Sequence, residues 1–78
     1  MSRTLEQLAR SYEVANFYDY VVESAVNGNW EQVGQLIREM RRIDRASLLK
    51  MVCFSGYDSW FDHLAKNTLI DCLIDALK

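Results

Sequence analysis

The sequence predicts an all-α fold: a compact bundle of four helices with no sheet. Apolar residues recur at helical spacing along the chain, no stretch alternates apolar and polar residues as a strand does, and no proline interrupts the pattern. The 78 residues are half apolar and carry a net charge of −2. This balance favours one folded domain over residues 1–78 rather than a disordered chain.

The first expected helix covers about residues 3–26. Leu5, Leu8 and Tyr12 have helical spacing, and later apolar residues continue the stripe with an offset. The offset leaves two alternatives open. We favour one continuous helix with a wide apolar face; in the other alternative, a short and a longer helix meet near Glu13.

The second expected helix, about residues 30–43, follows the clearest break in the chain. Gly28 suits the left-handed conformation that ends many helices, and Asn29 suits the next N-cap, with Gln32 completing a capping box. Because the turn is so short, the two helices should pack antiparallel. The apolar stripe of the second helix consists of Trp30, Val33, Leu36, Ile37, Met40 and Ile43.

Two further helices are expected over about residues 45–54 and 59–77. Asp44 suits the N-cap of the third helix, and Asp58 or Ser59 suits the N-cap of the fourth. The last two turns of the fourth helix are apolar nearly all round, and a small domain cannot cover a helix completely. Either the other helices cover the surplus, or a second copy or another protein does. We predict a homodimer that associates through Ile70, Ile74 and Leu77.

The sequence contains no recognisable catalytic motif. It has no glycine-rich phosphate loop, no nucleophile elbow and no zinc-protease signature. His63 is the single histidine, and Cys53 and Cys72 lack the close spacing of metal ligands. We therefore expect no enzymatic activity, no metal and no cofactor. Both cysteines should be reduced core residues of a cytoplasmic protein.

Residues 38–50 concentrate positive charge in an otherwise acidic chain, with five basic residues against two acidic ones. If the second helix extends through its four arginines, their spacing places them on one arc of roughly 100°. Guanidinium groups on one face can bind carboxylates or phosphates, whereas the plain alternative is a solvated face with local ion pairs. We predict a partner-binding site formed by Arg38, Arg41, Arg42 and Arg45, together with an exposed aromatic residue, Tyr20.

A helix-turn-helix motif has two possible placements. The first uses residues 5–15 and the helix after them, with Glu13 where glycine is usual and Asp19 where an apolar residue is needed. Its reading helix has no lysine or arginine for phosphate contacts. The second placement turns at Asp44, and its reading helix offers only Arg45, Ser47 and Lys50.

The leading hypothesis is a non-enzymatic protein–protein interaction module, acting as a regulator, adaptor or inhibitor of a larger assembly. Its partner would present an acidic surface to the arginines. The alternative is a small dimeric nucleic-acid-binding regulator that uses the same arginines. No apolar run reaches about 18 residues and no basic start precedes an apolar stretch, so we expect neither a membrane partner nor a secretory signal.

Overall fold

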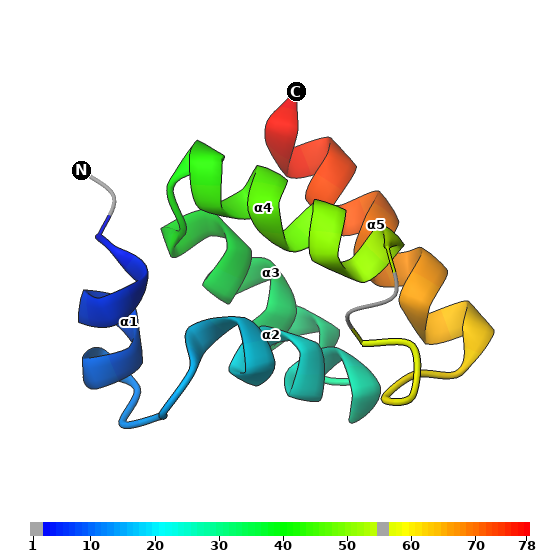
Figure 1. Ribbon diagram of the computed structural model, residues 1–78, viewed down its shortest axis with the longest axis horizontal. Coiled ribbons are helices and arrows are strands. Elements are labelled where there is room, and N and C mark those ends of the chain that lie inside the picture. Colours follow the sequence, from blue (N-terminus) through cyan, green and yellow to red (C-terminus); the bar gives the residue numbers. More distant parts are fainter. Residues whose placement is uncertain (1–2, 55–56) are drawn as a thin grey trace.

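Five helices form the protein in the computed structural model, which describes residues 3–54 and 57–78 (Figure 1). The all-α prediction is confirmed, but the predicted number of four helices is wrong. Over the described part of the chain, the only strand-like pairing is one isolated bridge between Arg3 and Met40. The helices are α1 (Leu5–Ser11), α2 (Phe17–Val26), α3 (Trp30–Glu39), α4 (Arg42–Cys53) and α5 (His63–Leu77).

The expected first helix is divided into α1 and α2, so the continuous helix that we favoured is wrong. Glu13 has a φ of 57°, in the left-handed region. The side chain of Asn16 then accepts a hydrogen bond from the backbone N–H of Asp19 and starts α2. The break turns Phe17 into the core, where only 2% of it is exposed. Burial of this ring explains the offset in the apolar stripe.

The turn between α2 and α3 is where the sequence places it. Gly28 has a φ of 78°, a conformation that glycine adopts without steric cost. Asn29 is the N-cap of α3, but its side chain donates to Gln32 Oε1 at 2.8 Å rather than bonding to the backbone. The predicted position is therefore right and the capping box is absent at this helix. From the turn, α3 returns across α2 (Figure 1).

The chain bends between α3 and α4, at a point where the sequence predicts continuous helix. Met40 and Arg41 are extended, with ψ angles of 148° and 154°. The predicted boundary at Asp44 is therefore wrong by several residues. The bend buries Met40 completely and carries Leu48 of α4 into the core. We call Met40 and Arg41 the elbow.

The last helix starts later than predicted. Asp62 is its N-cap and accepts a hydrogen bond from Ala65 N at 2.8 Å, so the predicted caps Asp58 and Ser59 are wrong. Tyr57 precedes it and is buried, and its hydroxyl donates to Asp19 Oδ1 at 2.7 Å. This bond fastens the segment before α5 onto α2.

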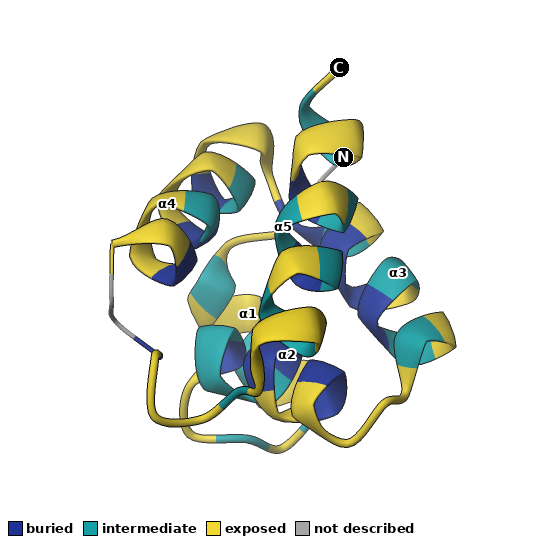
Figure 2. Ribbon diagram, turned by 90° about the vertical axis from the view of Figure 1, so that its right-hand side faces the viewer, coloured by how far each residue is buried: buried dark blue, intermediate teal, exposed yellow. Residues whose placement is uncertain are grey.

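All five helices contribute to one hydrophobic core. α4 packs along α5, and α2 packs against α3 and α5. Figure 2 shows that the buried residues of α4 face the body of the molecule and that its other side is exposed. The largest fully buried side chains are Leu8, Leu36, Met40, Leu48, Leu69 and Leu73.

Candidate functional site

The four predicted arginines do not share one helical face. Arg38 lies in the last turn of α3, Arg41 lies in the elbow, and Arg42 and Arg45 belong to α4. The prediction of a single arc assumed a helix running through all four positions, and the elbow interrupts it. Each arginine therefore has to be judged by its own contacts.

Arg45 is used by the fold. Its guanidinium donates to Ile37 O at 2.8 Å, to Arg38 O at 3.0 Å and to Ala76 O at 2.9 Å. These carbonyls lie in the last turns of α3 and α5, where helices leave carbonyl groups without intrahelical partners. A positive charge there also interacts favourably with the helix dipoles. Arg45 thus joins the ends of two helices and has little capacity left for a partner.

Arg41 forms an ion pair within the elbow. Its Nε donates to Asp44 Oδ2 at 2.9 Å, and Asp44 is only 6% exposed. The hydrogen bond to Asp44 raises the pKa of Arg41 above its ordinary value. Tyr18 of α2 donates to the backbone oxygen of Asp44 at 3.2 Å. Arg41 therefore neutralises a buried carboxylate while part of its side chain remains exposed.

Arg38 and Arg42 are exposed and form no ion pair among the residues described. The side chain of Arg38 folds back along α3. Its Nη1 lies 3.5 Å from the position that a Cβ on Gly34 would take. It lines a groove between α3 and α5, together with Asp75. Arg42 lies in the first turn of α4. Of the four predicted arginines, these two are available to a partner.

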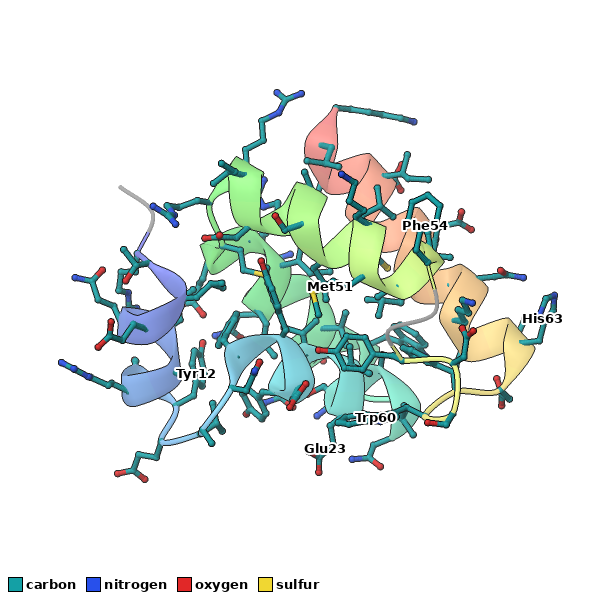
Figure 3. The ribbon with its side chains drawn as sticks, in the orientation of Figure 1. Tyr12, Glu23, Met51, Phe54, Trp60 and His63 are labelled. Atoms are coloured by element: carbon teal, nitrogen blue, oxygen red, sulfur yellow. The ribbon has the colours of Figure 1, made fainter. Side chains whose placement is uncertain are left out.

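The exposed side of α4 gathers features that the sequence analysis did not combine. Ile43 is 67% exposed and Phe54 is 74% exposed. Ile43, Lys50 and Phe54 are spaced i, i+7 and i+11, which puts them on one stripe of the helix. Figure 3 places Phe54 at the C-terminal end of α4 and Met51 one turn earlier. We define the outer face of α4 as the exposed residues of this helix together with the adjoining Phe54: Arg42, Ile43, Ala46, Ser47, Lys50, Met51, Cys53 and Phe54.

The charge on this outer face is only positive. Asp44 is the single acidic residue of α4, and it is buried against Arg41. Arg42 and Lys50 have no ion pair within the described part of the chain. Five other basic side chains do have one: Arg3 with Glu39, Arg10 with Glu6, Arg41 with Asp44, Lys66 with Asp58, and Lys78 with Asp75.

Tyr20 is less exposed than predicted. It is half-buried, and its ring lies 5.5 Å from that of Tyr12 and 6.3 Å from that of Phe17. Its hydroxyl accepts a hydrogen bond from Gln32 Nε2. Tyr12 in turn donates to Glu39, and this bond raises the pKa of Tyr12, with a smaller contribution from burial. The cluster connects α1, α2 and α3, so Tyr20 stabilises the fold. Part of its side chain remains exposed.

The predicted self-association residues differ in exposure. Ile70 and Leu77 are half-buried, whereas Ile74 is 42% exposed. The neighbouring helices thus cover much of the surplus that the sequence indicates. Two apolar side chains outside the predicted self-association set are also exposed, Leu64 at 76% and Trp60 at 41%.

The cysteines do not form a reactive centre. Both are free; Cys53 is exposed, against the prediction of a core residue, and Cys72 is half-buried. Burial raises the pKa of the Cys72 thiol, and the nearby Asp75 adds to this shift. A raised pKa keeps the thiol protonated and poorly nucleophilic. Within residues 3–54 and 57–78, no group of three His, Cys, Asp or Glu side chains could hold a metal ion.

Comparisons with protein families, with curated proteins and with solved structures gave no match. Across the described helices, none has both the length and the apolar character to cross a membrane. Function is therefore inferred from the exposed residues of the protein.

Proposed function

We propose that this protein is a non-enzymatic protein–protein interaction module that docks through the outer face of α4. As a regulator, adaptor or inhibitor of a larger assembly, it would bind a partner that presents carboxylates beside an apolar site. One observation carries the proposal. The outer face holds two cations that form no ion pair among the residues described, Arg42 and Lys50, together with two large exposed apolar side chains, Ile43 and Phe54.

This combination resembles the anatomy of a protein interface. Aromatic and aliphatic anchors supply most of the binding free energy, and charged residues around them select and orient the partner. The middle of the face, at Ala46 and Ser47, consists of small residues that allow another surface to approach closely. The inner side of α4 is held by Leu48, Val52 and Arg45, so a partner would meet a rigid helix and its binding would cost little ordering entropy.

Nucleic acid is the second candidate, because Arg38, Arg41 and Arg42 all remain exposed near the elbow. Phosphate contacts need cations along the whole surface. The outer face has two cations, and the apolar side chains of Ile43 and Phe54 cannot bind a phosphate. The first helix-turn-helix placement has the required bend at Glu13, yet its second helix, α2, carries Asp19 and Glu23. These observations favour a protein partner.

The proposal is tested by a pair of variants with the same change in net charge. Lys50→Glu reverses a charge on the outer face, and Arg10→Glu reverses one on α1, where 78% of the Arg10 side chain is exposed. The tagged variants and the wild-type protein are used for quantitative affinity capture from extract of the producing cells. We expect Lys50→Glu to lose a captured protein by about tenfold, the effect of one hot-spot contact. Arg10→Glu should retain it.

The same three proteins are then titrated against labelled duplex DNA and RNA by fluorescence anisotropy at low and physiological salt. Salt-sensitive binding that Lys50→Glu or Arg42→Glu abolishes would favour the nucleic-acid candidate. Identical capture by all three proteins, with no binding to nucleic acid, would contradict a role for the outer face of α4 in either function.

A further inference from the structure

A second exposed apolar site lies where α2 ends and where α3 and α5 begin. Val26, Trp30 and Leu64 line a hollow of about 240 Å3 there, and Asp62 stands at its edge. Val26 is 42% exposed and Leu64 is 76% exposed. Figure 1 shows these helix ends at the lower right, apart from α4 in the upper half. We call this site the α2–α5 corner.

The charge around the corner is opposite to that of α4. Asp62 lines the hollow, and Glu31 follows Trp30 in the chain. Glu23 lies one turn before Val26 on α2 and lines the neighbouring hollows beside Tyr20. All three carboxylates belong to exposed residues, and none has an ion pair among the residues described. Figure 3 shows Glu23 at the lower edge of the molecule. No lysine or arginine lines the hollow.

We propose that the α2–α5 corner of one copy receives the outer face of α4 of a second copy, so that the protein associates head to tail. This inference rests on the proposed function, because it uses the same face of α4 for docking. The chain itself carries both complementary halves. An apolar helix face with Arg42 and Lys50 meets an apolar hollow lined by Asp62, with Glu31 and Glu23 on the adjoining turns of α3 and α2. Charge complementarity of this kind selects the partner and fixes its orientation.

A symmetric contact between two α4 helices is less favourable. The outer face carries cations and no exposed carboxylate. In an antiparallel pair centred between Ser47 and Lys50, the two copies of Lys50 would lie near each other across the two-fold axis. Like charges that face each other oppose such a contact. The acidic corner removes this conflict.

The size of the surfaces predicts weak association. The twelve residues of α4 span about 18 Å, so the contact belongs to the small interfaces of transient complexes. Because the contact is not symmetric, each docked copy keeps one free corner and one free α4. Association then proceeds to open chains unless the rotation between copies closes a ring.

Sedimentation velocity of the full chain over a series of concentrations tests this inference. For the wild type we expect the mean mass to rise with concentration and to fall again at high salt, which screens the charges. Leu64→Glu removes the apolar contact of the corner, and Lys50→Glu reverses a charge on α4. Each variant alone should remain monomeric at concentrations at which the wild type and the control Arg10→Glu associate, with the dissociation constant raised about tenfold or more. Circular dichroism and melting curves show whether each variant is folded.

Mixing the two variants gives the decisive result. In an equimolar mixture, the intact α4 of Leu64→Glu can dock on the intact corner of Lys50→Glu, so a one-to-one dimer that grows no further is expected. No dimer in the mixture, or a monomeric wild type at every concentration, would overturn the inference. Loss of association in Lys50→Glu with full association in Leu64→Glu would also overturn it and indicate a symmetric α4 contact. If the wild type is monomeric while Lys50→Glu still loses a captured partner, the self-association fails and the proposed function stands.

Discussion

The two sides of α4 use the same residue types for different purposes. On the inner side, the guanidinium of Arg45 donates to three carbonyl oxygens and the elbow arginine Arg41 neutralises the buried Asp44. On the outer side, Arg42 and Lys50 meet no carboxylate of the described protein. A basic run in a sequence therefore shows where positive charge lies, but not which of its side chains can bind a partner. What frees a cation for a partner is the lack of nearby acceptors, and tertiary structure decides that.

The largest difference between the two sides should appear when an apolar side chain is removed. Leu48 is fully buried on the inner side, so Leu48→Ala should lower the free energy of unfolding by about 3 kcal/mol through lost burial and a cavity. Ile43→Ala, the matched change on the outer face, where Ile43 is 67% exposed, should alter it by less than about 0.5 kcal/mol. Urea denaturation followed by circular dichroism measures both values. Equal losses in the two variants would show that α4 is not held by one side only.

The second comparison is between two arginines of α4. Arg45→Ala leaves the carbonyls of Ile37, Arg38 and Ala76 without their shared donor, and we expect a loss of about 2 kcal/mol in the free energy of unfolding. Arg42→Ala should cost less than about 0.5 kcal/mol. Arg45→Lys should recover only part of the loss, because an ammonium group lacks the planar fork of donors. Thermal melting of the three variants provides the measurement, and an Arg45→Ala protein as stable as Arg42→Ala would contradict the role of Arg45 in joining α3 and α5.

The fold could be predicted from the sequence only in part. Helical periodicity gave the all-α class, and Gly28 gave the turn before α3. The bend at Glu13 was the less favoured of two alternatives and the elbow at Met40 was not predicted, because neither residue type is a strong helix breaker. Both bends exist because they turn apolar side chains into the core, which depends on residues distant in the sequence.

The candidate site was predicted in part for the same reason. The basic segment of residues 38–50 does contain Arg42 and Lys50, the two cations of the outer face that have no ion pair in the described part of the chain. The role of Arg45 depends on carbonyls of α3 and α5, which no local pattern indicates. Phe54 could have been connected with Ile43 by helical spacing once α4 was known to begin at Arg42.

A smaller effect concerns Tyr57, which fastens the segment before α5. Burial is the main cause that raises the pKa of Tyr57 above its ordinary value of 10.0, and the hydrogen bond to Asp19 adds to it. A raised folded-state pKa means that the folded protein holds this proton more tightly than the unfolded chain. The stabilisation is therefore complete below about pH 10 and is lost as the pH rises further, towards the folded-state pKa.

Tyr57→Phe removes that dependence together with the hydrogen bond. We expect a loss of about 1 kcal/mol near neutral pH and a shallower decline of stability above about pH 10 than in the wild type. Urea denaturation at neutral and alkaline pH measures the slope. Tyr12 and Tyr18 also have raised pKa values, so part of the decline should persist. An unchanged alkaline slope in Tyr57→Phe would contradict the assignment.

The central claim is that the outer face of α4 binds a partner while its inner face holds the fold. Site-directed photo-crosslinking tests it most directly, with a photoreactive amino acid at Ser47 in the middle of the outer face and, as control, at the exposed Gln35 of α3. We expect a crosslinked protein product from position 47 in the producing cells, absent from position 35 and lost when Lys50→Glu is added. The same products from both positions, or products from position 47 that persist with Lys50→Glu, would contradict it.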